Sequence, residues 1–290
     1  MMVIYNMFRT QSALDAYTLE NNTPPSQWSS SVWNILDSET SSPSDVLTTL
    51  SIFAPLKDCY AKKAGVIEGY TVGEHTIRVI ELAQKYRACL EQDVSDLVTW
   101  SEFLLFLALH DIGKGIANDN RSSLSTQQFK EEELRTTRHI LKKTMEHLGV
   151  PTQKNEIFCE LLQFDTLGDY LQFKTTIEQA SDNIFEMADN CHASPKTFYR
   201  LFKTFHIVDA ASYPNLEPLF TRDESSISYT EGLKQVSALL EERLSIPQAT
   251  NNKVAPKALS SQHSYTNLYL IAGLATTGLI TVGLLFKNMK

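Results

Sequence analysis

Residues 103–115 read FLLFLALHDIGKG, and this stretch decides the fold that we expect. Its first seven residues are apolar on every side, which is typical of a helix buried at the centre of a bundle. His110 and Asp111 follow at the end of that helix, where a charged carboxylate is costly to bury unless a metal ion or a partner charge compensates it. An imidazole and a carboxylate together offer nitrogen and oxygen ligands to a divalent cation. Residues 112–115 then form a turn that frees backbone for a ligand.

Outward from this helix the hydrophobic pattern stays helical and predicts an all-α fold. Apolar residues at helical spacing from Val72 to Tyr86 mark one face of an amphipathic helix. Ser95 or Asp96 is a candidate N-cap of the central helix, and Gly113 is a candidate for its end. Further helices are predicted over residues 28–36, 131–148, 155–164, 175–188, 195–211 and 229–244. No segment shows the alternation and the flanking turns that are typical of strands.

Composition divides the chain into four parts. Residues 1–51 are mixed, and we interpret them as an N-terminal extension that partly packs on the main domain. Within this extension, the Ser- and Thr-rich residues 37–51 are predicted to form a loop. Residues 52–244 are the main helical domain. Residues 245–264 contain Pro, Asn, Ser and Thr and indicate a flexible linker, and residues 265–287 are a predicted transmembrane helix.

The predicted membrane anchor depends on the stretch LYLIAGLATTGLITVGLLF at residues 268–286, which carries no charge. A helix of this length spans roughly 28 Å, close to the hydrocarbon thickness of a bilayer. Tyr265 and Tyr269 lie where interfacial aromatic residues belong, and Lys287 and Lys290 flank the far end. We therefore expect a tail-anchored protein that contacts the lipid bilayer through this segment and keeps its helical domain in the cytosol.

Charge and composition limit the partners that we expect. The net charge is −8 and no basic run is present to meet a phosphate backbone, so general nucleic-acid binding is not expected. A locally positive site would still admit nucleotides as substrates. The four cysteines lie far apart without a CxxC pair, which excludes a zinc finger and a disulfide framework. Gly273, Gly278 and Gly283 leave a homodimer open, although their spacing is not that of a GxxxG motif.

Three segments carry a resemblance to a known family. They are GEHTIRVIELA at residues 73–83, LALHDIGKG at residues 107–115 and HIVDAASY at residues 206–213. Together they resemble the HD-domain superfamily of metal-dependent phosphohydrolases over roughly residues 60–215. The resemblance implies an HD-domain-like helical bundle that binds a divalent metal through a first His, the His-Asp pair and a distant Asp. These places fall on His75, His110, Asp111 and Asp209.

The last metal-binding carboxylate is open between three aspartates. We favour Asp209, because Phe202, Phe205, Ile207 and Val208 place it in an apolar stretch where an acid needs a partner. Asp182 and Asp189 also lie on predicted helices. Asp189, however, sits in the more polar sequence ADNCH.

The resemblance points to one metal ion rather than two. Members of the superfamily with two metals use two further His residues between the pair and the last Asp. Here Phe164 precedes Asp165 where the second of these would fall. His139 and His147 lie on the charged helix predicted at residues 131–148, and we interpret them as surface residues. Manganese, cobalt, magnesium, iron and zinc are all open as the metal.

The resemblance implies hydrolysis of a phosphate ester by a metal-dependent phosphomonoesterase or phosphodiesterase, which the predicted anchor would tether to a membrane. The substrate would be a phosphorylated small molecule, with nucleotides and cyclic nucleotides open. The cation would polarise a phosphoryl oxygen and lower the pKa of a bound water. Lys114, just past the pair, and Arg78, one turn after His75, are expected to meet the phosphate as charged groups. Residues 131–133 and Asp165 are open as the general acid or base.

A non-enzymatic alternative keeps the same fold. A catalytically degenerate HD domain would act as a nucleotide-sensing or scaffolding module at a membrane. The missing His at Phe164 favours this alternative. A secreted bacterial effector in a host membrane and a protein of a eukaryotic organelle both suit a tail-anchored layout, and the sequence does not decide between them.

Overall fold

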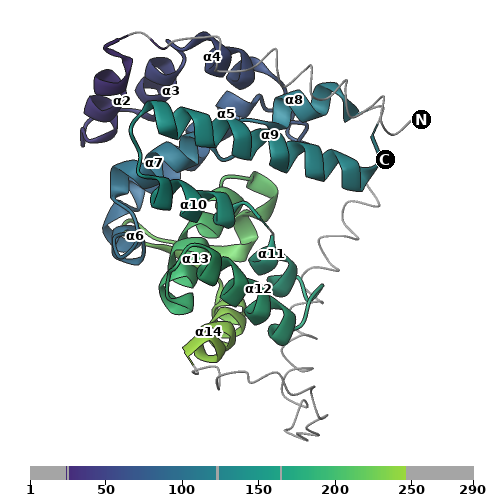
Figure 1. The fold of residues 1–290 in the computed structure, drawn as a ribbon. Helices are drawn as coiled ribbons and strands as arrows, with labels where there is room; N and C mark the ends of the chain where they lie inside the picture. The colour runs from purple at the N-terminus through teal and green to yellow at the C-terminus, as the bar shows by residue number, and fades with distance from the viewer. Residues whose placement is uncertain (1–23, 25, 122–123, 164, 246–290) are drawn as a thin grey trace, which may run out of the picture.

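The computed structural model describes residues 24, 26–121, 124–163 and 165–245, which are mostly helical (Figure 1). In chain order the elements are α2 (Trp28–Leu36), α3 (Pro43–Leu50), α4 (Ala54–Ala61), α5 (Val72–Lys85), α6 (Arg87–Val94), α7 (Trp100–Leu109), α8 (Lys114–Asp119), α9 (Thr126–His147), α10 (Thr152–Leu161), α11 (Thr166–Leu171), α12 (Ile177–Asn190), α13 (Pro195–Ala211), the 3-10 helix η3 (Pro214–Leu219), β1 (Phe220–Arg222), β2 (Ile227–Tyr229) and α14 (Glu231–Ser245). The predicted helical character is confirmed for these residues, apart from one short β-hairpin.

The helix α7 forms the centre of the core, as its apolar sequence predicts. Residues 103–109 are all buried. Fully burying one such side chain contributes about 1.5–3 kcal/mol, so α7 is a main source of stability. Thr99 caps the helix rather than Ser95 or Asp96. Its hydroxyl accepts a hydrogen bond from the Glu102 backbone N–H, and the Glu102 carboxylate accepts one from the Thr99 N–H.

The chain turns sharply after α7, and α9 holds this turn in place. His110 is the C-cap of α7, whereas Gly113 is the N-cap of α8 and not the end of the central helix. A Cβ on Gly113 would lie 2.5 Å from the backbone nitrogen of Thr137 in α9. The Gly113 N–H donates a hydrogen bond to Thr137 Oγ1 at 3.2 Å. The close approach of α9 therefore requires glycine and positions the residues on either side of the turn.

Helices from distant parts of the chain pack around α7 (Figure 1). Both α5 and α9 contact α7, and α13 contacts α5 and α6. The Phe205 ring of α13 also meets the Phe106 ring of α7 edge to face, with ring centroids 4.9 Å apart. The end of α7 therefore lies beside α5, which comes earlier in the chain, and α13, which comes much later.

The loop predicted over residues 37–51 is wrong, because the structure contains α3 there. Pro43 occupies its first turn, and the Ser42 hydroxyl accepts a hydrogen bond from the Asp45 backbone N–H while the Asp45 carboxylate accepts one from the Ser42 N–H. Val46 and Leu50 of this helix are buried. The two helices of the predicted extension thus belong to the core, with α2 against α7 and α3 against α5.

The expectation that no strands occur is also corrected. Antiparallel β1 and β2 pair Phe220 with Tyr229. The Asp223 side chain accepts hydrogen bonds from the backbone N–H groups of Ser225 and Ser226 and closes the turn between the strands. These strands are three residues each, too short for alternation to be visible in the sequence.

Some predicted helix boundaries agree with the structure and others do not. The predicted limits of α2 and α13 match the structure. The helix predicted from residue 131 begins earlier, at Thr126, because Ser125 and Gln128 form a capping box. Gly149 has a φ of 76° just beyond α9, a conformation that glycine adopts without strain.

None of the helices in the part of the chain that the structure describes is long and apolar enough to cross a bilayer. The predicted span at residues 265–287 lies outside the described residues. The same is true of the linker from residue 246 onward, of residues 1–23, and of Phe164.

Substituting Gly113 by alanine is expected to destabilise the fold, because the new methyl group would meet the backbone of α9 at 2.5 Å. Overpacking of this kind typically costs about 1–3 kcal/mol or more. Gly232→Ala is the matched control, since a Cβ there meets nothing within 4 Å in α14 and is expected to be neutral or stabilising. The free energy of unfolding in denaturant gives the comparison. Equal stability of the two variants would contradict the close approach of Thr137.

Candidate metal centre

His75 lies in the first turn of α5 and points into the core. Thr71 and Glu74 form a capping box in which the Thr71 hydroxyl accepts a hydrogen bond from the Glu74 N–H at 3.1 Å, and the Glu74 carboxylate accepts one from the Thr71 N–H at 2.7 Å. The side chain of His75 is fully buried. The Tyr213 ring stacks on its imidazole, with ring centroids 4.6 Å apart and an interplanar angle of 26°. The cap and the stacked ring thus set the position of this imidazole.

His110 is held at the end of α7 by two contacts. Its Nδ1 lies 2.7 Å from the carbonyl oxygen of Leu107. Because a carbonyl oxygen only accepts hydrogen bonds, Nδ1 carries the hydrogen and Nε2 is left facing His75 and Asp209. Phe205 packs against the His110 ring at 75°, with ring centroids 5.6 Å apart. The imidazole therefore has one orientation.

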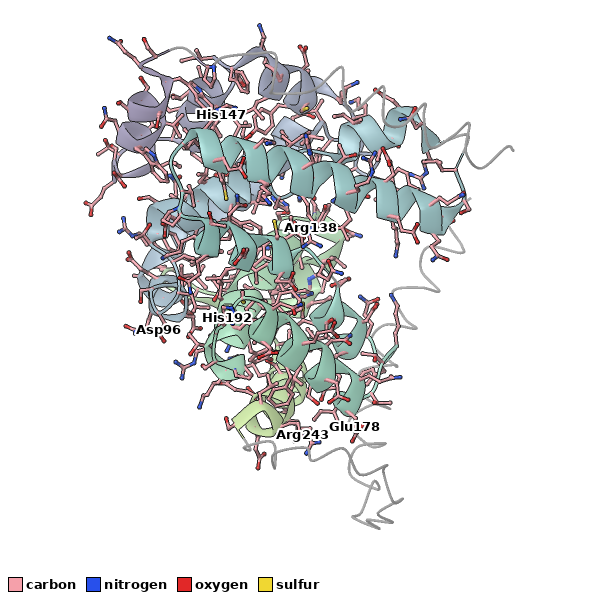
Figure 2. All side chains as sticks on the ribbon, in the orientation of Figure 1. Asp96, Arg138, His147, Glu178, His192 and Arg243 are labelled. Carbon is pink, nitrogen blue, oxygen red and sulfur yellow. The ribbon has the colours of Figure 1, made fainter. Side chains whose placement is uncertain are left out.

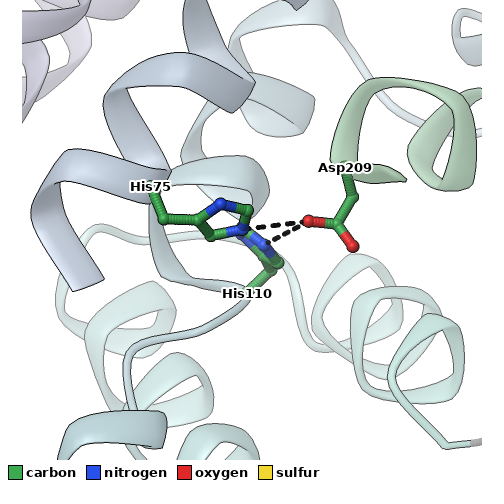
Figure 3. Close-up of side chains that lie close together, drawn as sticks. All are labelled: His75, His110 and Asp209. Atoms are coloured by element: carbon green, nitrogen blue, oxygen red, sulfur yellow. Dashed lines mark hydrogen bonds and ion pairs between the residues drawn. The ribbon is translucent and has the colours of Figure 1, made fainter. Parts of the chain in front are cut away.

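Asp209 approaches both imidazoles from α13 (Figure 3). Its Oδ1 lies 3.0 Å from His75 Nε2 and 3.3 Å from His110 Nε2. One ligand atom from each of these three residues lies within 4.8 Å of the other two. The Asp209 side chain is 29% exposed, whereas the side chains of His75 and His110 are 0% and 2% exposed. The group is therefore reached by solvent from the carboxylate side.

Asp111 adds a second carboxylate to this group. Its Oδ2 lies 3.2 Å from His75 Nε2 and 3.6 Å from His110 Nε2. The same oxygen accepts a hydrogen bond from Lys114 Nζ at 2.6 Å. The structure thus brings His75, His110, Asp111 and Asp209 together in one place, and Lys114 joins them through an ion pair.

The hydrogen bonds of the two imidazoles leave both Nε2 atoms available to a metal. The Ser212 hydroxyl donates its single hydrogen to the Asp209 carbonyl oxygen at 2.6 Å. It therefore accepts from His75 Nδ1, which lies 3.3 Å away. In both imidazoles Nδ1 donates to an outer partner, the arrangement that fixes the tautomer of metal-binding His residues.

Charge interactions inside the group shift the pKa values of its members. Burial alone would lower the pKa of His75, but hydrogen bonds to Asp111 and Asp209 outweigh it and raise this pKa to about 9. Burial would raise the pKa values of both aspartates. For Asp111 the charge of Lys114 outweighs burial, and for Asp209 the hydrogen bonds from His110 and His75 do so, so both pKa values lie below the usual range. Both carboxylates are therefore ionised and need positive charge beside them.

A divalent cation fits this set of donors. Two Nε2 atoms and Asp209 Oδ1 face one another. Without a metal, a proton on His75 Nε2 links them, in keeping with the raised pKa of His75, and a divalent cation would take the place of that proton. Such atoms converge only around a proton or a cation. Imidazole nitrogen with carboxylate oxygen suits zinc, iron, cobalt and manganese. The donors thus agree with the predicted ligand set, in which Asp111 is the fourth member.

Some residues predicted to take part lie elsewhere. Arg78 is exposed, and its guanidinium carbon lies 4.5 Å from the centroid of the Tyr70 ring. The structure therefore does not bring Arg78 to the metal-ligand group, because its position one turn after His75 places it on the outer side of α5. Asp182 and Asp189, the alternative last ligands, are exposed on α12.

The other His residues of the described chain also lie apart from the group. His139 lines a separate pocket between α9 and α10, together with Arg138. His147 packs against the Phe53 ring, with ring centroids 6.4 Å apart, and His192 follows α12 as an exposed residue (Figure 2). His147 is exposed, as predicted for a surface residue, whereas His139 is half-buried.

Sequence reasoning missed two residues of the site, Ser212 and Tyr213. Both follow Asp209 within the quoted HIVDAASY stretch, so their nearness in sequence was the available signal.

Of the acids left open as general acid or base, Glu133 has a pKa raised by burial. Burial and the charge of Asp169 raise the pKa of Asp165 to about 6.

No family model, curated protein or solved structure matches the chain.

Replacing Asp209 by asparagine keeps the shape of the side chain and removes its charge. We expect the affinity for Mn²⁺ or Zn²⁺ to fall by more than the roughly 10–100-fold that loss of an outer-shell partner costs. Asp189→Asn is the matched control and should retain the affinity, because Asp189 is exposed on α12. Metal content per chain and titration calorimetry give the comparison. Loss of metal in Asp189→Asn alone would assign the last ligand to α12.

His206 is expected to make folding sensitive to acid. Burial lowers the pKa of His206 to about 4, so the ring is neutral near pH 7, and its Nδ1 lies within hydrogen-bonding distance of the Tyr229 hydroxyl at 2.9 Å. Because the folded pKa lies below the unfolded value, this stability is complete above about pH 6.5 and is lost as the pH falls towards 4. The loss in the native protein should exceed that in His206→Gln by about 1–3 kcal/mol. Unfolding free energies at pH 7 and pH 4.5 measure it, and parallel losses would refute the assignment.

Proposed function

We propose that this chain is an HD-type, metal-dependent phosphohydrolase that acts on a phosphate ester at a membrane. The observation that carries the proposal is the convergence of His75, His110 and Asp209, each of which offers a ligand atom within 4.8 Å of the others. Asp111 Oδ2 lies 3.2 Å from His75 Nε2 and completes the set of residues that would hold one divalent ion. When bound, such an ion supplies Lewis acidity to a phosphoryl oxygen and a nucleophilic water near neutral pH.

Lys114 supports a phosphate substrate rather than a neutral one. Its ammonium lies beside the metal-ligand group and its side chain is 19% exposed, so it can reach a ligand that enters from solvent. Lysine binds phosphate as a point charge. Its pairing with Asp111 at 2.6 Å fixes where that charge lies. Arg78 is left out of the proposed phosphate site, because it lies over the Tyr70 ring.

The proposal includes one metal ion rather than two. Support comes from the placement of His139, His147 and His192, none of which joins the ligand group in the described part of the chain. Phosphorylated small molecules, nucleotides and cyclic nucleotides among them, are the proposed substrates. The apolar residues 268–286 support the membrane anchor, with the helical domain in the cytosol and a homodimer as a further proposal.

A second candidate function is a catalytically degenerate HD domain that senses a nucleotide or serves as a scaffold at the membrane. The observation that favours it is the pairing of Lys114 with Asp111, which ties up the one cation that the described chain offers directly beside the ligand group. A sensor would bind a nucleotide without releasing phosphate. Turnover therefore separates the two functions.

We expect the purified full chain, with non-ionic detergent present, to release phosphate from a set of nucleotides and aryl phosphates when Mn²⁺ or Co²⁺ is added. Chelation by EDTA should abolish the activity, and the same metal should restore it. His110→Gln is expected to lower kcat/KM by more than 100-fold, on the order of the effect of losing one electrostatic catalytic contact. His192→Gln should leave it unchanged, because His192 is exposed and separate from the group.

Two outcomes would contradict the proposed hydrolase. Equal phosphate release by the native protein and by His110→Gln would show that the activity comes from elsewhere. Nucleotide binding that depends on the metal and on His110, with no phosphate released over many hours, would establish the sensor instead.

A further inference from the structure

The phenol of Tyr213 lies directly against the metal-ligand group. Its hydroxyl oxygen is 3.3 Å from His75 Nε2. Lys114 is held near the same imidazole, because its Nζ lies 2.6 Å from Asp111 Oδ2 and that oxygen lies 3.2 Å from His75 Nε2. Tyr213 is half-buried. Its hydroxyl is thus placed beside the imidazole that a ligand of the group would approach.

The backbone around Tyr213 is fixed from both sides. The residue leaves α13 in an extended conformation, with φ −89° and ψ 121°, as expected before a proline such as Pro214. Arg222 of β1 donates a hydrogen bond from Nη2 to the Ala211 carbonyl oxygen at 2.6 Å. The hairpin thus braces the end of α13, which is where the ring turns back onto His75. Stacking of the phenol ring on His75 then limits the positions that the hydroxyl oxygen can take.

We propose that the Tyr213 hydroxyl and the Lys114 ammonium form a two-donor site for a phosphoryl oxygen beside the metal ligands. This inference rests on the proposed function and extends it, because it names the residue that orients the substrate. Lys114 supplies charge on a flexible stem, whereas the stacked phenol supplies a hydrogen bond of fixed direction. Tyr213 is in this sense a substrate-positioning residue, and not a ligand that holds the metal.

The charges around the site explain why a neutral donor serves here. Asp111 and Asp209 place negative charge beside the incoming anion, and the Lys114 charge is shared with Asp111 at 2.6 Å. A hydrogen-bond donor that adds no further negative charge therefore strengthens the binding of a phosphate at this site. A ring that only packed against His75 would need no hydroxyl, so phenylalanine at this position separates packing from hydrogen bonding.

The test uses the full chain loaded with Mn²⁺ and inorganic phosphate as the probe. Tyr213→Phe keeps the ring stack and removes the hydroxyl. We expect the Kd for phosphate to rise about 3- to 10-fold, the factor for one net hydrogen bond, while the Kd for Mn²⁺ and the midpoint of thermal unfolding stay unchanged. Phosphorus NMR measures phosphate binding, and Mn²⁺ EPR measures metal binding, so neither readout needs turnover.

Tyr170→Phe is the matched control. The Tyr170 hydroxyl donates to the Val236 carbonyl oxygen at 3.3 Å in the contact between α11 and α14, so its loss should leave phosphate binding unchanged. Native phosphate affinity in Tyr213→Phe overturns the two-donor site. Weaker Mn²⁺ binding in Tyr213→Phe also overturns it, because the phenol would then act on the metal ligands. Failure of the native protein to bind Mn²⁺ refutes the proposed function itself, and the Tyr213 site with it.

Discussion

The structure depends on holding two carboxylates against two buried imidazoles. Moving an ionised group from water into a protein interior costs several kcal/mol, and attraction to a partner offsets this only when the geometry is good. Here Asp111 gains Lys114 at 2.6 Å, and Asp209 gains the two imidazoles at 3.0 Å and 3.3 Å. The ligand group therefore forms only if α5, α7 and α13 are placed to within about 0.5 Å, the tolerance of a functional metal site. The contacts that surround the group hold the three helices in these positions.

Each helix is fixed near the residue that it contributes. The capping box of Thr71 starts α5 one turn before the imidazole that it carries. At the end of α7, the turn is pinned to α9 by the hydrogen bond from Gly113 to Thr137, and no side chain fits between them. The Phe205 ring touches both α7 and the His110 ring, so α13 aligns with α7 through the same residue that orients the imidazole. Packing and site geometry are thus set by shared contacts.

Much of this arrangement can be predicted from the sequence, and the failures have physical causes. The all-apolar run before His110 is typical of a buried helix, and Asp209 beside an apolar stretch needs a partner, so both predictions agree with the structure. The α3 helix was missed because its capping signal, SPSD, lies in a Ser-rich segment that reads as a loop. Arg78 was chosen by spacing from His75, but a spacing of three residues does not settle which of the two faces the core. Tyr213 lies beyond the end of its helix, where periodicity no longer predicts direction.

Stability alone does not account for the ligand group. Apolar residues of similar volume in place of a buried ionic cluster are often neutral or stabilising by about 1–4 kcal/mol. The group is also asymmetric, because the imidazoles are almost fully buried while the Asp209 side chain is 29% exposed. A cluster that served only to hold helices together would have no reason to open to solvent on its anionic side. Lys114, whose side chain is 19% exposed, and the half-buried Tyr213 lie beside this group and offer donors to an anion. This asymmetry supports the proposal that the group binds a cation and a phosphate, because a purely structural role does not explain it.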